Sequence, residues 1–191
     1  MKRVLKYFFY VLIFIAFIGF IITEVLGNFH KVDNNVFRSG QLNEYNLRYY
    51  AKKYKFKTIL NLRGPSSRPY YTNEIKISNE YNITHIDHAI SNSKYLTLDQ
   101  TSKLVKVMRE AKKPMLIHCA GGADRTSLLA ALYQYAIKKH SVAVAKEEFS
   151  IFYGYLPFFR PKVLAMRKSF DNYVKKTIAK DSHENQIIRN K

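Results

Sequence analysis

The strongest constraint on how this chain folds lies at residues 118–126, which read His-Cys-Ala-Gly-Gly-Ala-Asp-Arg-Thr. An apolar run at 114–117 precedes this segment and is typical of a short buried strand, and the apolar run at 127–137 that follows is typical of a buried helix. Gly121 and Gly122 allow a tight turn between them, with backbone N–H groups turned inward. A strand, a loop of small residues and a helix N-terminus together form a geometry that binds a phosphate dianion.

The remaining side chains of this segment predict a nucleophile in the loop. Cys119, the single cysteine among 191 residues, lies six positions before Arg125, and the helix N-terminus and the guanidinium both stabilise a thiolate. Arg125 also offers a planar fork of donors that matches two phosphate oxygens. We expect Thr126 to donate its hydroxyl to the sulfur, and His118 to order the loop through hydrogen bonds to its carbonyls. A buried structural cysteine would explain Cys119 but not its neighbours. The predicted phosphate-binding residues are Ala120, Gly121, Gly122, Ala123, Asp124 and Arg125.

The pattern His-Cys-x5-Arg-Thr resembles the signature loop of the cysteine-dependent phosphatases, the protein-tyrosine and dual-specificity superfamily, and its form is most similar to bacterial dual-specificity-like members. Residues 36–41 and 59–64 resemble the first two strands of the same group, so the resemblance covers roughly residues 32–175. Ser127 stands where many relatives carry glycine. The resemblance implies hydrolysis of phosphomonoesters through a phosphocysteine, without a metal or organic cofactor.

Strands and helices are expected to alternate along the chain from residue 28. The predicted strands lie near 36–38, 57–62, 83–88 and 114–118, and the predicted helices near 43–54, 71–81, 98–112, 125–139, 142–153 and 161–178. Thr97 and Gln100 form a plausible capping box for the third helix. This order predicts an α/β fold with a central, mostly parallel sheet flanked by helices, and a site at the carboxyl ends of the strands. The expected catalytic domain spans 32–178 and a polar, frayed tail spans 179–191.

The N-terminus predicts attachment to a membrane. Residues 7–23 contain no charge and are rich in Phe, Ile, Leu and Val, which is marginally enough for a spanning helix. Lys2, Arg3 and Lys6 precede this run and Glu24 follows it, so residues 1–6 are expected in the cytoplasm and the catalytic domain outside it. We interpret 7–26 as an uncleaved, single-pass signal anchor in the cytoplasmic membrane. A cleaved signal peptide and a buried core helix are the alternatives. A lone cysteine suits export, because no second thiol is present to pair with it.

A carboxylic acid is needed to protonate the leaving group, and three aspartates are candidates. Asp87 ends the strand predicted at 83–88, approximately where dual-specificity phosphatases carry their general acid. Asp124 lies inside the loop beside Arg125, a position thought to serve as the acid in some bacterial relatives. Asp99 is explained by the favourable helix dipole in the first turn of its helix. The sequence places Asp87 slightly ahead of Asp124. Arg63 follows a strand and is a possible substrate contact.

Two further features limit the choice of ligands. His85, Asp87 and His88 are close in sequence, but the two histidines point to opposite faces of a strand, so no metal site is expected. The net charge of +18 indicates attraction to anionic substrates or lipid head groups, and the expected export makes nucleic acid the least favoured partner. The stretch 152–159 is interpreted as a helix end that packs on the core, in preference to an element that enters the membrane.

These features predict a membrane-anchored phosphatase whose substrate is a lipid or glycan phosphate at the cell envelope. A protein tyrosine or dual-specificity phosphatase acting on phosphoproteins is the alternative. A non-catalytic phosphate-binding module is a third interpretation, but such a module could dispense with Cys119. The oligomeric state is not predicted.

Overall fold

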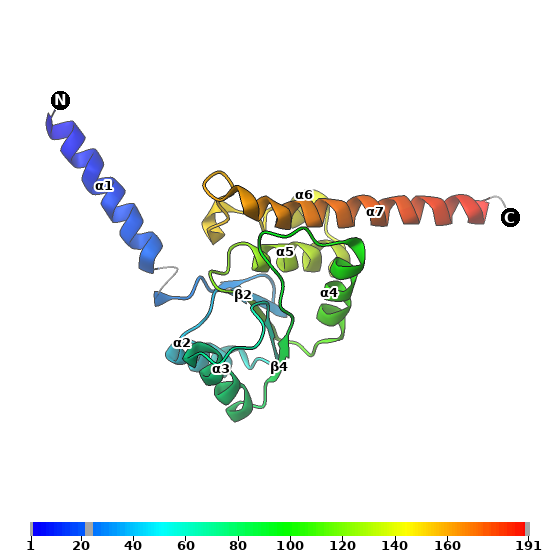
Figure 1. Ribbon diagram of the computed structural model, residues 1–191, viewed down its shortest axis with the longest axis horizontal. Coiled ribbons are helices and arrows are strands. Elements are labelled where there is room, and N and C mark those ends of the chain that lie inside the picture. The colour runs from blue at the N-terminus through cyan, green and yellow to red at the C-terminus, as the bar shows by residue number, and fades with distance from the viewer. Residues whose placement is uncertain (1, 22–24, 190–191) are drawn as a thin grey trace.

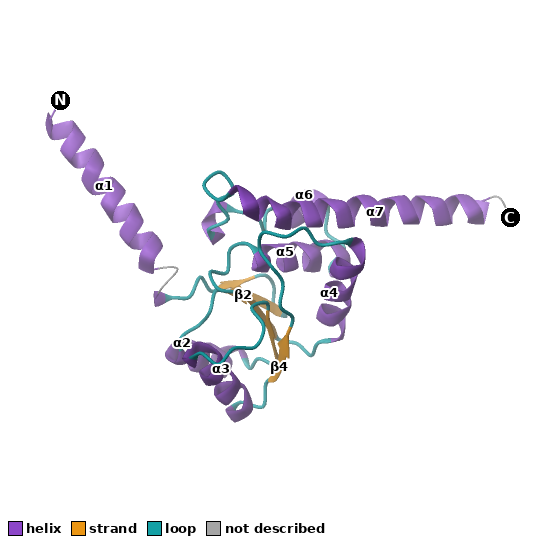
Figure 2. Cartoon of the chain, viewed as in Figure 1, coloured by secondary structure: helices purple, strands orange, loops and turns teal. Residues whose placement is uncertain are grey.

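The computed structural model describes residues 2–21 and 25–189 and has a five-stranded sheet at its centre (Figure 2). The strand order is β1-β2-β5-β3-β4, and every neighbouring pair is parallel except β1 with β2. The predicted α/β fold with a mostly parallel sheet is therefore confirmed. Only β1 was not predicted, because two polar residues carry no pattern. The strands are β1 His30–Lys31, β2 Val36–Ser39, β3 Thr58–Asn61, β4 Thr84–Asp87 and β5 Met115–His118.

Helices cover both faces of the sheet and bury two apolar clusters. Helices α2 (Glu44–Tyr54) and α3 (Pro69–Glu80) cover one face, and α4 (Leu98–Glu110), α5 (Arg125–Leu132) and α7 (Leu164–Arg189) cover the other. Along β3, Ile59 packs in the cluster beneath α2 and α3, and Leu60 packs in the cluster on the opposite face, as the two-residue period of a strand requires. Because both faces are covered, β2, β3 and β5 are buried along their whole length.

The register places four polar residues in one row at the carboxyl end of the sheet. Ser39 pairs with His118, His118 with Asn61, and Asn61 with Asp87. Each of these residues is the last of its strand. The side chains that follow the strands therefore gather at one edge, which is where ligands bind in open α/β sheets.

Two predicted helices have different bounds in the structure. The predicted capping box of α4 is present, with Thr97 and Gln100 each bonded to the other's backbone. The helix expected at 142–153 stops early, however: α6 is Val142–Lys146, and a separate 3-10 turn, Ile151–Tyr153, is capped by the Ser150 hydroxyl. The α5 helix continues through 137 as a π-helical turn.

Two other expectations concern the C-terminal part of the chain. Where a polar, frayed tail is expected at 179–191, α7 continues as helix to Arg189, and residues 190–191 lie outside the described part. The segment 152–159 was expected to pack on the core, but Phe152, Phe158 and Phe159 are exposed and Tyr155 supplies its buried ring. Gly154, at φ +78°, ends the 3-10 turn and redirects the chain.

The N-terminal helix α1 (Lys2–Phe20) extends away from the domain (Figure 1). Its stretch Arg3–Phe20 has a mean hydropathy of 1.9, and none of it is buried, which argues against a core helix. By length and composition it could cross a membrane, and a signal sequence would look the same. Part of the predicted anchor, residues 22–24 including Glu24, lies outside the described residues.

Candidate active site

The loop between β5 and α5 is the centre of the candidate site. β5 ends at His118, Cys119 begins the loop as a buried free thiol, and α5 begins at Arg125. The strand–loop–helix unit expected from the sequence is therefore present. Gly122 adopts φ +72°, and a Cβ there would lie 2.5 Å from the Gly40 nitrogen, so this position requires glycine. Gly121 has no such constraint, because its surroundings are open and its φ is not positive. The expected need for two glycines is thus corrected to one.

The carbonyl groups of the loop are bonded on its outer side. In a trans peptide the carbonyl and the following N–H point in opposite directions, so outward carbonyls turn the N–H groups of 120–124 inward. Such a ring of amides is an anion-binding cradle. The outward contacts are Cys119 O with His118 Nδ1 (3.3 Å), Ala120 O with Gln41 N (2.8 Å), Gly121 O with Asn28 Nδ2 (2.8 Å), Gly122 O with Arg38 Nη2 (2.9 Å), and Ala123 O with Ser127 Oγ.

Arg38 braces this loop from within the core, a role that the sequence analysis missed. Its side chain is 1 % exposed, forms an ion pair with Glu148, and donates to the Gly122 carbonyl and to the Ser127 hydroxyl. Its guanidinium carbon lies 3.8 Å from the centre of the Tyr153 ring. Burial lowers the pKa of Arg38, and the negative charge of Glu148 opposes this effect. An arginine inside an apolar strand was the available signal, because such a residue needs buried partners.

Arg125 lies at the N-terminus of α5, held against the edge of the sheet. Its Nη1 donates to the Leu62 carbonyl at 2.9 Å and to the Ile90 carbonyl at 3.3 Å. Its Nε is buried and has no hydrogen-bond partner among the described residues, so it can donate to a bound anion. Thr126, expected to donate to the sulfur, instead contacts the Ser39 carbonyl at 3.4 Å, because α5 packs its first turn against β2.

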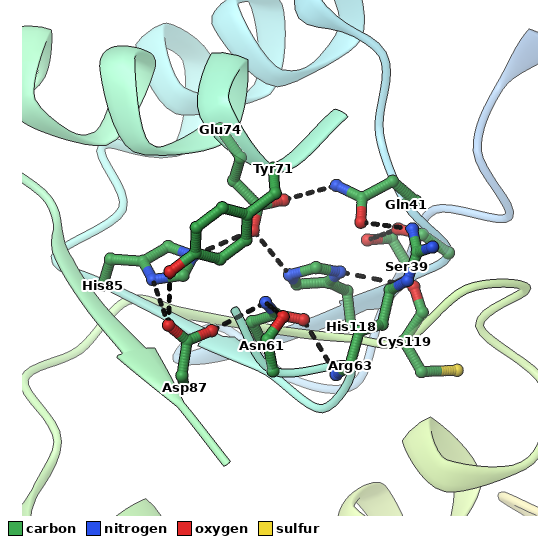
Figure 3. Close-up of polar contacts among 12 residues, drawn as sticks. Ser39, Gln41, Asn61, Arg63, Tyr71, Glu74, His85, Asp87, His118 and Cys119 are labelled. Carbon is green, nitrogen blue, oxygen red and sulfur yellow. Dashed lines mark hydrogen bonds and ion pairs between the residues drawn. The ribbon is translucent and has the colours of Figure 1, made fainter. Parts of the chain in front are cut away.

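Behind the loop, Glu74 of α3 connects two histidines in a buried network (Figure 3). Its Oε1 contacts His118 Nε2 at 3.1 Å and His85 Nε2 at 2.8 Å, and its Oε2 accepts from Gln41. Burial alone would raise the pKa of Glu74, but the charge and hydrogen bonds of His118 and His85 outweigh it and lower the pKa. Glu74 thereby orients His118, whose other nitrogen makes the predicted contact with the loop carbonyl. A glutamate in a predicted helix gave no signal of this role.

The two histidines once considered for a metal site have separate partners. His85 faces Glu74, and His88 donates its backbone amide to the Asn61 carbonyl. In the described part of the chain, no group of three His, Cys, Asp or Glu side chains is arranged to hold a metal ion.

The two candidate acids have different surroundings. Asp87 accepts from Asn61 at 2.8 Å through one oxygen and from the Tyr71 hydroxyl at 2.6 Å through the other, and this bond raises the pKa of Tyr71 to about 12. Figure 3 shows the Cys119 sulfur pointing away from this network, with Asp87 at the opposite end of it. Both oxygens of Asp87 are thus occupied on the far side of the network from the thiol.

Asp124 is buried within the loop itself. Its Oδ2 accepts from Arg160 at 3.0 Å and from Asn92 at 3.3 Å, while its Oδ1 is buried without a partner among the described residues. Asp124 thus has one carboxylate oxygen within the loop that no side chain or backbone group of the described residues occupies, whereas both oxygens of Asp87 are bonded. The geometry therefore favours Asp124 over Asp87, the reverse of the order given by the sequence.

Two remaining candidate residues from the sequence already have partners within the protein. Arg63 donates to the Gln41 side chain at 2.8 Å and stacks 3.6 Å from the Tyr70 ring centre, so its contact with substrate stays a prediction. Asp99 is exposed in the first turn of α4 and pairs with Lys103 at 2.7 Å.

Comparison with known proteins agrees with this geometry. The model of the tyrosine phosphatase family matches residues 25–186. Similar solved structures include TpbA of P. aeruginosa, with 17% identity over 76% of this chain and 88% of that chain and a TM-score of 0.61. The catalytic domain of the PP-IP phosphatase SIW14 of S. cerevisiae shares 22% identity over 81% and 93%, with a TM-score of 0.59. PTPMT1 shares 13% over 79% and 99%, with a TM-score of 0.56. TpbA has been solved with pTyr and PTPMT1 with PI(5)P. No curated protein sequence matches the chain.

Proposed function

Because the chain belongs to the tyrosine phosphatase family of cysteine-dependent phosphatases, we propose that it hydrolyses phosphomonoesters at a membrane surface, with Cys119 as the nucleophile. The observation that carries this proposal is the loop itself. Five carbonyls bonded on its outer side leave the inner amides for a phosphoryl group, and Cys119 lies where the loop begins. A module that only bound phosphate would need the cradle but not a thiol within it.

In the proposed reaction, the Cys119 thiolate attacks phosphorus in line with the leaving oxygen. A phosphorus–sulfur bond forms, the phosphorus–oxygen bond breaks, and the departing alkoxide takes a proton from Asp124. The loop amides and Arg125 hold the three other oxygens. Water then attacks phosphorus, Asp124 takes its proton, and the thiolate leaves with release of orthophosphate.

Arg160, whose side chain is 46% exposed, holds Asp124 through Oδ2 at 3.0 Å, which leaves the buried, unpartnered Oδ1 of Asp124 for the proton transfer. Thr126 and His118 position the loop in this scheme.

We assign the substrate to phosphorylated lipids or glycans of the envelope, reached by a domain that α1 anchors outside the cytoplasmic membrane. An exposed apolar helix and a net charge of +18 support this assignment. The solved complex of PTPMT1 with PI(5)P supports a lipid phosphate. The complex of TpbA with pTyr supports the second candidate, a phosphoprotein.

The test is turnover by the full-length protein in detergent. Cys119→Ser should abolish hydrolysis of p-nitrophenyl phosphate, and Arg125→Lys should lose several orders of magnitude, because a point charge cannot replace the two-pronged contact. Arg48→Lys, at a half-buried position of α2 where Arg48 pairs with Glu44 and Glu80, is the matched control and should retain activity. Activity near the wild-type level in Cys119→Ser, or complete inhibition by a chelator, would contradict the mechanism. A panel of phosphopeptides, phosphoinositides and phosphatidylglycerophosphate then identifies the substrate class.

A further inference from the structure

The connection between α6 and α7 displays large apolar side chains to solvent. We call residues 151–159 the aromatic loop. Phe152, Phe158 and Phe159 are 83%, 89% and 76% exposed, and Ile151 is exposed as well. Single exposed apolar residues are normal on a protein surface, but four within nine positions of one short loop, called the patch below, are a concentration of the kind that marks an interaction site.

The aromatic loop is held firmly, so its exposed rings are displayed by a braced structure. Tyr155 is buried in the core and stacks edge-on against Phe149, with ring centres 5.1 Å apart. Arg160 donates to the Gly154 carbonyl at 2.7 Å and also pairs with Asp124 of the catalytic loop. The patch therefore has a fixed position beside the active site.

The aromatic loop also lies where the chain arrives from α1. The Asn28 side chain donates to the Tyr153 carbonyl at 2.9 Å, and the His30 ring lies edge-on to Tyr153 at 4.9 Å. Asn28 lies eight positions after Phe20, the end of α1, and an extended chain covers at most about 3.5 Å per residue. The part of the aromatic loop that Asn28 contacts is therefore tethered within roughly 30 Å of the end of α1. In Figure 1 the connection between α6 and α7 lies on the side of the domain that α1 leaves.

The positive charge near the patch indicates what kind of surface it binds. Arg160, which pairs with Asp124, and Lys162 lie within three positions of the last ring, and the whole chain carries a net charge of +18. Aromatic rings next to basic residues are typical of segments at an anionic membrane interface. A second copy of the chain would bring the same positive charge and be repelled.

We propose that the aromatic loop inserts Phe152, Phe158 and Phe159 into the interface of the bilayer that α1 spans. This proposal rests on the membrane attachment proposed above, but not on the identity of the substrate. Docking holds the catalytic loop near the lipid head groups, because Arg160 and Gly154 connect the two loops.

The chain contains no tryptophan, so one substitution supplies a specific fluorescent probe. Phe158→Trp is placed at the patch, and Tyr45→Trp, at an 85% exposed position on α2, is the matched control. Each full-length variant is reconstituted into vesicles of phosphatidylcholine and phosphatidylglycerol. We expect the emission of Phe158→Trp to shift to the blue and to be quenched by brominated lipid at least about twofold more than that of Tyr45→Trp. Acrylamide in the water should quench the control more.

Equal quenching of both variants by acrylamide, with no effect of brominated lipid, would overturn the proposal. A blue shift that grows with protein density and is insensitive to brominated lipid would overturn it in favour of contact between copies. Flotation with the vesicles tests the anchor separately. Chains that fail to float would contradict the membrane attachment and this proposal together, whereas floating chains with a water-exposed probe contradict only the docking.

Discussion

Replacing Arg38 by methionine should destabilise the domain and impair the catalytic loop together. The change keeps most of the side-chain volume but leaves the carboxylate of Glu148, which is 9% exposed, without its cation. It also removes the donors to the Gly122 and Glu148 carbonyls. Breaking a buried ion pair from one side costs about 3–5 kcal/mol, because an uncompensated charge stays buried. That is a large share of the roughly 5–15 kcal/mol that stabilises a typical domain.

The assay is urea unfolding of the full-length protein in detergent, followed by near-ultraviolet circular dichroism. Arg48→Met is the matched control, because Arg48 pairs with Glu44 and Glu80 at the surface and its loss should change the unfolding midpoint little. Adding Glu148→Gln to Arg38→Met should recover part of the loss, since it removes the stranded charge. With p-nitrophenyl phosphate, KM should rise, because the Gly122 peptide is no longer held. If Arg38→Met unfolds no earlier than Arg48→Met, the bracing role is wrong.

Three further predictions concern the acid, the buried network and the membrane topology. Asp124→Asn should slow the hydrolysis of alkyl phosphates by about 10²–10⁴-fold and that of p-nitrophenyl phosphate far less, as measured by steady-state kinetics. Asp87→Asn should slow neither reaction to this extent, and the opposite pattern would assign the acid to Asp87. The pKa of Glu74 is lower in the folded protein than its value of about 4.5 in the unfolded chain, so the ionised side chain stabilises the fold at pH values above 4.5. This stabilisation is lost as the pH falls from 4.5 through the pKa of the folded protein. Glu74→Gln should therefore lower the unfolding free energy at pH 7, with a smaller difference at pH 3–4, and a difference independent of pH would contradict this. A C-terminal alkaline phosphatase fusion should be active and a green fluorescent protein fusion dark, and the reverse would put the domain in the cytoplasm.

The sequence predicted what depends on neighbouring residues. Alternating apolar runs located four strands within one or two residues of their observed bounds, and the Thr97 capping box was found because both its members lie within one turn. The catalytic loop was identified for the same reason, since Cys119 and Arg125 lie on one short segment.

Contacts between distant segments could not be predicted in this way. Arg38 meets Glu148 across 110 positions, and Glu74 meets His118 across 44, so neither pairing leaves a local pattern. The order of the two candidate acids changed because it depends on partners such as Tyr71 and Arg160. The exposed rings of the aromatic loop were misjudged because hydrophobicity alone does not tell a core residue from one displayed at the surface.

The outward bonding of the loop carbonyls also bears on how the enzyme releases its product. A cradle whose amides are already aimed inward recognises the phosphoryl group that is transferred and makes no demand on the alcohol attached to it. Orthophosphate offers the same oxygens as the ester, so the empty enzyme should take up its own product without rearrangement. Turnover should consequently slow as free phosphate accumulates, which would tie the rate of dephosphorylation to the concentration of free phosphate around the catalytic domain.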